Sequence, residues 1–293
     1  MPATVTKPKV KLGNTRVTGK EQYYTPVELA AELVAQVVAL VPDFANRTIL
    51  EPAGGTGSFI EAARKFGATK FVSFDIEPKH ESVIRGDFLK TKLGGKKTKL
   101  HGAIALSNPP FGRNNSLSIP FFNRAAEHCD VIAFIVPRSW RKWSVINRLN
   151  RNFELVHDHD LQIDYTDDGG TLISNRRLLA TCFQVWRRTE TLRPLIAVQD
   201  RAIVTKVKPA DADVSLTVFG YGCGTVHETF ERRANTTRMF LKLNHPDALK
   251  ALKSVDFSKF YRNTAYTEAL SLQEINYLLN EYVFGDAFLI EKS

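Results

Sequence analysis

The sequence of 293 residues contains few cysteines: only Cys129, Cys182 and Cys223. Three widely spaced cysteines cannot form the disulfide framework of a small secreted protein. We therefore expect the chain to fold in a reducing compartment.

Long apolar runs are also absent. The longest candidate, residues 29–41, is interrupted by Glu32 and Gln36 and has the pattern of an amphipathic helix. The N-terminus lacks the apolar core of a signal peptide. These absences predict an intracellular protein, in the cytoplasm or the nucleoid, with no membrane partner.

Positive charge, in contrast, is abundant. The formal net charge is +9, and residues 191–293 contain 13 basic and 12 acidic side chains, so residues 1–190 carry a charge of +8. An excess of this size in one part of the chain favours a polyanionic partner such as nucleic acid. A basic protein without such a partner has the same composition, so charge alone leaves both interpretations open.

Short apolar runs alternate with helical patterns in the first two thirds of the chain. We predict strands at 48–50, 71–74, 103–106 and 131–136, and helices that begin at Thr25-Pro26, at 58 and at 121. Thr25 is expected to cap the first helix. The alternation predicts an α/β fold with a parallel sheet covered on both faces, whose ligands bind beyond the carboxyl ends of the strands.

The composition divides the chain into three parts. Residues 1–20 are rich in lysine without helical periodicity and predict a basic flexible arm. Residues 21–190 contain the α/β pattern. Residues 191–293 have short β-like runs followed by helical patterns, which predict a smaller α+β region with an accessory or target-recognition role.

A glycine-rich turn, EPAGGTGSF, follows the first predicted strand. Gly55 and Gly57 match the first two glycines of a dinucleotide fingerprint, but Ile60 occupies the place of the third. Glu51 would repel a pyrophosphate, whereas it suits a ligand that carries an ammonium and a sulfonium group. A glycine turn with no ligand remains the alternative.

Two further acidic residues extend this pattern. Asp75 ends the next predicted strand, where it can accept hydrogen bonds from both hydroxyls of a ribose, and Asp87 can accept one from an adenine amino group. Together with Glu51 they favour S-adenosylmethionine (SAM) as the cofactor.

A second motif, Asn108-Pro109-Pro110-Phe111, follows another predicted strand. Because proline fixes its own φ and restricts the residue before it, the loop should be stiff. The Asn108 side-chain oxygen and the Pro109 carbonyl can then accept both hydrogens of an exocyclic amine. This draws the nitrogen toward tetrahedral geometry and releases its lone pair. Phe111 offers a face on which an extruded base can stack.

With these motifs in this order, residues 21–190 resemble the γ-class SAM-dependent N6-adenine methyltransferases. The resemblance implies a Rossmann-like sheet, direct methyl transfer to a flipped adenine, and DNA as the partner. Tyr23-Tyr24-Thr25-Pro26 matches the family's aromatic-Thr-Pro motif. The implied cofactor-binding residues are Tyr24, Thr25, Glu51, Gly55, Gly57, Asp75 and Asp87, and the implied catalytic residues are Asn108, Pro109, Pro110 and Phe111.

The sequence departs from the family pattern in two places. Gly54 stands where the family often has alanine or cysteine, and the late-loop aromatic that covers the base has no certain counterpart. Tyr165 and residues 166–174 are the candidates for this cover.

Several alternatives to DNA adenine methylation remain. RNA adenine methyltransferases share the core, and the carboxamide of a protein glutamine offers a similar planar amine. A nucleic-acid-binding module that has lost catalysis is a further alternative, which the intact Asn-Pro-Pro-Phe motif disfavours. Methylation of cytosine at C5 is excluded more firmly, because it uses a cysteine that usually stands beside a proline, and none of the three cysteines does.

One cluster of histidines and aspartates has the residue types of a metal site, and alternating residues of a strand share a face. A polar strand end near the cleft explains this cluster better, so we expect no metal. The cluster consists of His157, Asp158, His159, Asp160, Asp164, Asp167 and Asp168.

Two basic stretches could track phosphates. In the first, tryptophans alternate with the basic residues, so a solvated helix whose indoles pack inward is an equal alternative. The first contains Arg138, Trp140, Arg141, Lys142, Trp143, Arg148 and Arg151, and the second contains Arg232, Arg233 and Arg238.

Overall fold

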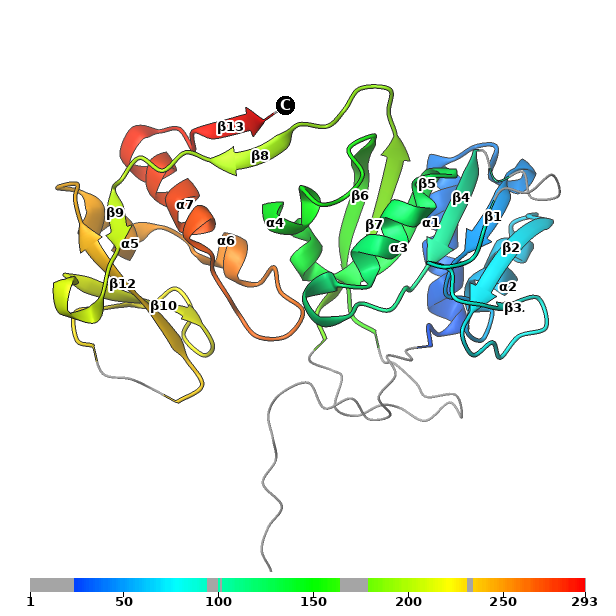
Figure 1. Cartoon of the computed structure of the whole chain (residues 1–293), viewed down its shortest axis with the longest axis horizontal. Helices are drawn as coiled ribbons and strands as arrows, with labels where there is room; N and C mark the ends of the chain where they lie inside the picture. The colour runs from blue at the N-terminus through cyan, green and yellow to red at the C-terminus, as the bar shows by residue number, and fades with distance from the viewer. Residues whose placement is uncertain (1–23, 94–99, 101, 164–178, 231–233, 293) are drawn as a thin grey trace, which may run out of the picture.

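Seven strands form one mixed sheet in the first part of the chain (Figure 1). The computed structural model describes residues 24–93, 100, 102–163, 179–230 and 234–292. The predicted arm at 1–20, Tyr165, the loop 166–174, and Arg232 and Arg233 lie outside the described residues. Within these ranges, no helix combines the length and the apolar character that crossing a bilayer requires.

The strand order in this sheet is β3-β2-β1-β4-β5-β7-β6. Strands β1 to β5 pair in parallel, and β7 is antiparallel to both of its neighbours. The bounds are β1 Thr48–Glu51, β2 Lys70–Asp75, β3 Ile84–Arg85, β4 Ala103–Ser107, β5 Cys129–Pro137, β6 Phe153–Leu161 and β7 Thr181–Arg188. This confirms the predicted α/β fold and its Rossmann-like sheet.

The sheet differs from the prediction in not being entirely parallel. Leu161, the last residue of β6, pairs with Thr181, the first residue of β7. β6 therefore ends and β7 begins at the same edge of the sheet, so β7 runs antiparallel to β6. Thr181 also pairs with Pro137, the last residue of β5, so Leu161 and Thr181 lie at the carboxyl edge of the parallel strands.

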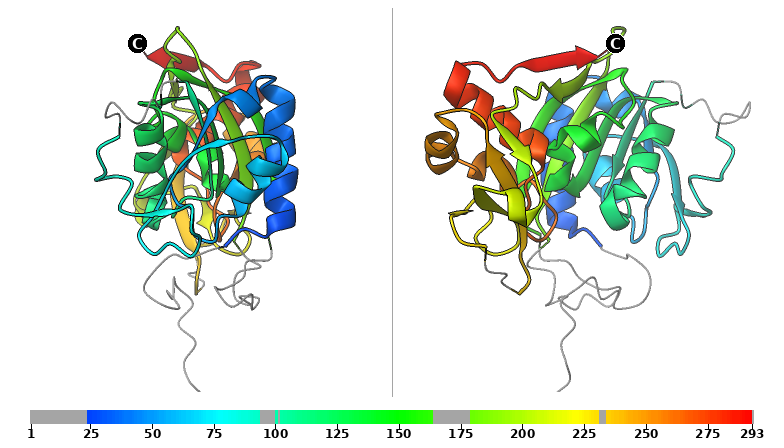
Figure 2. Two further views of the ribbon diagram at one scale, coloured as in Figure 1. Left: turned by 90° about the vertical axis from the view of Figure 1, so that its right-hand side faces the viewer. Right: turned by 60° about the vertical axis from the view of Figure 1, so that its left-hand side comes forward.

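Helices cover both faces of the sheet (Figure 2). Helices α1 (Val27–Leu40) and α2 (Ser58–Lys65) pack on one face, where side chains such as Ile49 and Ala133 are completely buried. Helix α3 (Ser118–Ala125), the 3-10 turn η3 (Arg138–Arg141) and α4 (Trp143–Ile146) cover the other face.

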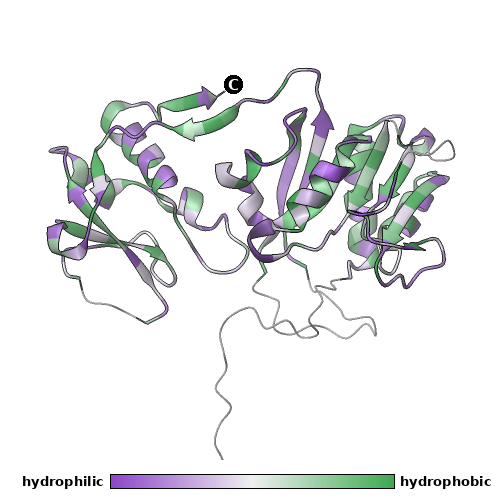
Figure 3. Ribbon diagram, in the orientation of Figure 1, coloured by the Kyte–Doolittle hydropathy of each residue, from purple (hydrophilic) through white to green (hydrophobic). Residues whose placement is uncertain are grey.

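Alternating burial in the central strands produces these two cores. In β5, Val131, Ala133 and Ile135 face the first core, whereas Ile132 and Phe134 face the second. A strand buried on both faces needs apolar residues throughout, which explains the continuous apolar run. Figure 3 shows apolar residues concentrated along the parallel strands of this sheet, whereas β6 is largely hydrophilic.

The start of α1 differs from the prediction. The N-cap position is Pro26, and no side chain caps the helix. The Thr25 hydroxyl instead accepts a hydrogen bond from Asn108, as described below. The Thr25 side chain points to the sheet edge, where Asn108 lies, and not to the backbone of α1.

The C-terminal part has its own core. Strands β9 to β12 form an antiparallel sheet with the order β11-β10-β12-β9, and helices α5 to α7 pack against it. The bounds are β9 Val204–Lys206, η5 Pro209–Asp211, β10 Val214–Phe219, β11 Val226–His227, β12 Thr237–Leu243, α5 Ala248–Ser254, α6 Ser258–Tyr261 and α7 Leu272–Phe284. Strands β8 (Leu195–Val198) and β13 (Leu289–Lys292) pair separately. The division at residues 190 and 191 stays a prediction.

A buried contact joins the two parts. Lys142 Nζ donates to both carboxylate oxygens of Glu274, at 2.9 and 3.0 Å, and to the Ala269 carbonyl at 3.2 Å. Next to it, the Trp143 ring packs against Phe260 and Tyr277, with centroid separations of 5.5 Å in both cases. The tryptophan thus packs inward, as one of the two sequence interpretations expected.

Candidate active site at the carboxyl edge of the sheet

Three neighbouring strands bring their polar ends together at one edge of the sheet. Glu51 ends β1, Asp75 ends β2, and β4 ends at Ser107, directly before Asn108. Strand β1 lies between the other two and pairs with both in parallel, so their carboxyl ends meet. This is the edge at which open α/β sheets bind ligands.

The turn between β1 and α2 requires glycine for two different reasons. Gly57 has a φ of 78°, in the left-handed region, and provides the N-terminal cap of α2. At Gly54, a Cβ atom would lie 2.4 Å from the Ser73 hydroxyl and 2.8 Å from a Val83 methyl group. The side chains of β2 and of the following loop therefore fill the space that an alanine or cysteine would need, which accounts for the departure at residue 54.

Asp75 fixes this turn through its carboxylate. Its Oδ2 accepts a hydrogen bond from the Gly55 amide, and its Oδ1 accepts one from the Glu77 amide, both at 2.8 Å. The Tyr24 ring lies over the turn, since a Cβ atom on Gly55 would be 3.0 Å from it. Tyr24, Gly55 and Asp75 thus lie together at this turn.

Glu51 is buried at the end of β1, close to the Ser107 hydroxyl at the end of β4. The residue is 2% exposed, and within the described part of the chain neither carboxylate oxygen forms a hydrogen bond of regular geometry. Burial raises the pKa of Glu51 well above the ordinary value; the Ser107 hydroxyl opposes this shift, and the negative charge of Asp75 adds to it. An acceptor left in this condition is costly unless a cation or a donor reaches it.

Asp87 lies farther along the same edge, in the loop after β3. Its Oδ1 accepts a hydrogen bond from the Leu89 amide at 3.0 Å, and its Oδ2 pairs with Lys90 at 3.0 Å. Phe88, the residue after Asp87, is buried against Phe74 and Phe121 and anchors the loop. The carboxylate is half-buried and organises its own turn.

The Asn108 loop is tied to the glycine turn through one residue. Asn108 Nδ2 donates to the Thr25 hydroxyl at 3.3 Å. The Thr25 backbone carbonyl accepts a hydrogen bond from the Ser58 hydroxyl, at the start of α2, at 2.8 Å. Thr25, 7% exposed, therefore connects the two predicted motifs inside the protein.

The last residues of the motif lie deeper than a stacking surface would. Pro109 is buried and Pro110 is half-buried. Phe111 is 6% exposed and belongs to the core on the α1 face. In this conformation its ring supports the loop from inside, an arrangement that the sequence pattern could not indicate.

One contributor to the site was missed from the sequence. A Cβ atom on Gly57 would lie 2.5 Å from the His80 ring, so this histidine packs directly on the glycine turn. Its Nε2 is 3.2 Å from Glu61 in α2. The only available signal was its position shortly after β2, because loops that follow the strands meet at this edge.

The residues at this edge fit a ligand that carries a positive charge. The buried carboxylate of Glu51 calls for a cationic group or a donor, and SAM carries both an ammonium and a sulfonium. Asp75 and the Gly55 backbone lie beside it.

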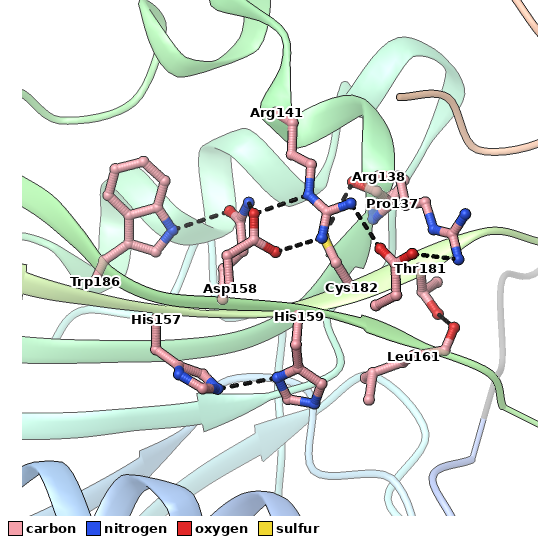
Figure 4. Close-up of polar contacts among 12 residues, drawn as sticks. Pro137, Arg138, Arg141, His157, Asp158, His159, Leu161, Thr181, Cys182 and Trp186 are labelled. Carbon is pink, nitrogen blue, oxygen red and sulfur yellow. Dashed lines mark hydrogen bonds and ion pairs between the residues drawn. The ribbon is translucent and has the colours of Figure 1, made fainter. Parts of the chain in front are cut away.

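The first basic stretch is largely engaged within the protein (Figure 4). Arg141 donates two hydrogen bonds to Asp158, at 2.7 and 2.8 Å, and one to Asp160 at 2.6 Å. Arg138 pairs with Asp160 at 2.9 Å. The Trp140 indole is completely buried. These contacts favour the structural interpretation of the stretch over phosphate tracking.

The same contacts divide the polar cluster on β6. Asp158 and Asp160 pair with the arginines, whereas His157 and His159 point to the face of the strand opposite Asp158 (Figure 4). His157 Nε2 lies 3.0 Å from Nδ1 of His159. Alternation along the strand thus separates the histidines from the aspartates. Among the described residues, no group of three or more potential metal ligands is assembled.

Comparisons with known proteins find similarity in architecture only. No family model matches the sequence, and no curated protein matches it. A protein from Pyrococcus horikoshii, provisionally described as an RNA methyltransferase, is 20% identical; the match covers 58% of this chain and 87% of that one, with a TM-score of 0.45.

Two further solved structures show a similar level of likeness. The methyltransferase subunit of a type I restriction-modification system from Streptococcus thermophilus is 14% identical, with 64% of this chain and 49% of that one covered and a TM-score of 0.43. TrmN from Thermus thermophilus is 15% identical, with 55% and 48% covered and a TM-score of 0.37. These low values carry no inference about activity.

Proposed function

We propose that this chain is a SAM-dependent methyltransferase that methylates the N6 amino group of adenine in DNA by direct transfer to a flipped base. One observation carries the proposal. Thr25 connects the Asn108 loop to the glycine turn, next to the buried carboxylate of Glu51. A loop suited to an exocyclic amine and a turn suited to a cationic nucleotide thus share one edge.

The cofactor's place in this proposal follows from the acceptors. SAM, when bound, supplies the methyl group. Glu51 would neutralise its cationic part, and Asp75 would accept hydrogen bonds from its ribose while retaining those from Gly55 and Glu77. A carboxylate oxygen has two lone pairs, so both sets of hydrogen bonds can coexist. Asp87 would contact the adenine, and Tyr24 would cover the turn.

The target amine would meet the Asn108 loop. Nδ2 of Asn108 donates to Thr25, and its side-chain oxygen is buried in this conformation, so the loop would have to move before that oxygen could accept one hydrogen of the amine. The Pro109 carbonyl can accept the other. Two fixed acceptors orient the nitrogen lone pair toward the methyl group without a covalent intermediate. Stacking of Phe111 on the base would require its ring to turn out of the core.

DNA is the preferred substrate within this proposal. The +8 charge on residues 1–190 suits a polyanion, although Arg138 and Arg141 are committed to Asp158 and Asp160 and contribute less than their number suggests. RNA would suit the same core, since the 2′-hydroxyl is read elsewhere. Methylation of a protein glutamine would leave the +8 charge on residues 1–190 without a role in substrate binding.

The test is transfer of labelled methyl from SAM to unmethylated duplex DNA, single-stranded DNA, RNA and a protein extract in parallel, followed by mass spectrometry of nucleosides and peptides. N6-methyladenine in DNA supports the proposal, and label only in RNA or protein reassigns the substrate. Asn108→Ala should lose the activity, whereas Asn263→Ala, an asparagine that donates to Lys259 within its own turn, should retain it. No label in any substrate contradicts the enzymatic function.

A further inference from the structure

Tyr221 is the most exposed large hydrophobic side chain among the described residues. Its exposure is 93%, at the tip of the loop Gly220-Tyr221-Gly222-Cys223-Gly224 between β10 and β11. Neighbouring Phe219 is 44% exposed. Aromatic rings presented in this way are more often found at binding surfaces than elsewhere on a protein.

The loop that carries Tyr221 is closely held. The Gly224 amide donates to the Thr217 carbonyl at 2.8 Å, and the Cys223 amide donates to the Gly220 carbonyl at 3.1 Å. Cβ atoms would clash at both flanking glycines, with the Asn235 carbonyl at 2.3 Å from Gly220 and with Phe257 at 2.9 Å from Gly224. The ring is therefore exposed on a fixed support, which lowers the entropy lost on binding.

Hydrogen bonds connect this loop to the edge that carries the candidate active site. The Gly220 amide donates to the Glu268 carbonyl at 3.0 Å, and a few residues earlier in the same segment the Ala265 carbonyl accepts from Ala180 at 2.7 Å. Ala180 directly precedes Thr181, which pairs with Pro137 at the carboxyl end of β5. The Tyr221 loop thus continues the edge on which Asn108 lies.

The charges around the loop favour an anionic partner. The acidic side chains of Glu228 and Glu274 are paired with Lys253 and Lys142, at 2.7 and 2.9 Å. Arg238 pairs across the sheet with Thr217, just before the loop, and its guanidinium donates to the Thr229 carbonyl at 2.7 Å. The carboxylate of Glu268 lies near Cys223 of the loop, so the positive charge here is small.

The neighbouring segment adds to the same surface. Tyr266, two residues before Glu268, is 51% exposed. Arg262 is also exposed, and its guanidinium lies 5.7 Å from the centre of the Tyr261 ring. A surface with exposed rings, an exposed arginine (Arg262) and lysine-paired carboxylates suits nucleic acid, whose bases stack and whose backbone is anionic.

We propose that Tyr221 stacks on a base of the nucleic acid near the target adenine and so helps to hold the strand across the sheet edge. This inference rests on the proposed function, because it needs a nucleic-acid substrate. It assigns to the C-terminal part a contact that neither the cofactor nor the Asn108 loop can make.

The test compares Tyr221→Ala with Tyr221→Phe, which keeps the ring. Binding is measured by fluorescence anisotropy with a labelled duplex and a labelled single strand, and methyl transfer is measured on the same oligonucleotides. We expect Tyr221→Ala to weaken binding roughly fivefold to hundredfold, the range for loss of one stacked base, and Tyr221→Phe to stay near the wild type. Tyr282→Ala, 40% exposed near the far end of α7, is the matched control.

A second readout distinguishes stacking from a structural role. Oligonucleotides that carry 2-aminopurine at single positions should show fluorescence quenching on binding to the wild type, and Tyr221→Ala should lose it at one position. If the wild type methylates nucleic acid and Tyr221→Ala binds and reacts normally, this inference is wrong while the proposed function stands. If the wild type binds no nucleic acid and Tyr221→Ala reduces methylation of a protein, both are wrong.

Discussion

The amide nitrogen of Asn108 donates to the hydroxyl of Thr25 at 3.3 Å, across 83 residues of sequence. This hydrogen bond determines which way the asparagine side chain faces. Thr25 in turn is held through its carbonyl by Ser58, at the start of α2. The orientation of the proposed catalytic group is therefore coupled to the turn that would hold the cofactor.

Substitution of Asn108 or Thr25 should lower the rate of methyl transfer more than the affinity for the cofactor. Asn108→Ala removes an acceptor of the amine, and we expect methyl transfer to fall by about 100-fold or more, as for loss of a positioned hydrogen-bonding group in other active sites. Thr25→Val should lower the rate less, because the asparagine remains but is no longer oriented. Single-turnover kinetics with saturating SAM measures both.

Cofactor affinity is the control for these variants. Isothermal titration calorimetry should show nearly unchanged SAM binding by Asn108→Ala. A rate near that of the wild type in this variant would contradict the assigned role.

Glu51 should release a proton when the cofactor binds. In the folded protein burial raises the pKa of its carboxyl well above the ordinary value, whereas a cationic ligand favours the ionised form. Binding measured by calorimetry in buffers of different ionisation enthalpy should reveal this release. Equal apparent enthalpies in all buffers, at a pH between the ordinary and the raised value, would contradict contact with a cation.

The same carboxyl should make stability depend on pH in the absence of cofactor. Because its pKa is raised in the folded state, the folded protein holds more protons than the unfolded chain above the ordinary glutamate pKa. The free energy of unfolding should therefore fall as the pH rises from that value toward the raised one. In Glu51→Gln, the free energy of unfolding measured by urea denaturation should depend less on pH over this window. The same variant should bind SAM more weakly.

Asp75→Asn should weaken SAM binding with little effect on the rate at saturation. The amide keeps one acceptor but loses the charge and one of the hydrogen bonds from Gly55 and Glu77. A charge-assisted hydrogen bond contributes about 1.5–3 kcal/mol, so we expect roughly 10-fold to 100-fold lower affinity. Asp43→Asn, on the surface at the opposite edge of the sheet, should bind SAM normally.

Removal of one partner of the Lys142–Glu274 pair should be strongly destabilising. Both side chains are mostly buried, at 16% and 3% exposure, so a lone partner keeps an uncompensated charge. Lys142→Met should cost about 3–5 kcal/mol in urea denaturation. The double substitution with Glu274→Gln should recover part of this loss, because glutamine can still cap α7 from the third position. Equal stability of the single and double variants would show that the charges are independent.

Much of the fold could be predicted because apolar runs directly indicate buried strands. The runs at 48–50, 71–74, 103–106 and 131–136 correspond to β1, β2, β4 and β5. The reversal of β7 could not be read in the same way, since a buried strand has the same composition in either direction. Its direction is fixed by the edge at which the chain re-enters the sheet.

The candidate site shows a similar limit. The approach of Gly55 to Asp75 follows from strand order and could be anticipated. The burial of Phe111 and the pairing of Arg141 with Asp158 depend on which side chains face each other after folding. Local patterns identify residue types with suitable chemistry, but only the tertiary packing decides whether an arginine meets a carboxylate or remains available to a phosphate.

The pairing of β8 with β13 has a consequence for the order in which the chain acquires its structure. Leu195 pairs with Lys292, and β8 is held on the first part of the chain by Asn147, which exchanges two hydrogen bonds with Ile196. During synthesis β8 leaves the ribosome long before its partner strand. Until β13 is synthesised, β8 has no strand to pair with among the described residues, and the Asn147 side-chain amide alone forms hydrogen bonds with the Ile196 backbone. Contacts this distant in sequence form slowly, so closure of this strand pair should be a late event in folding.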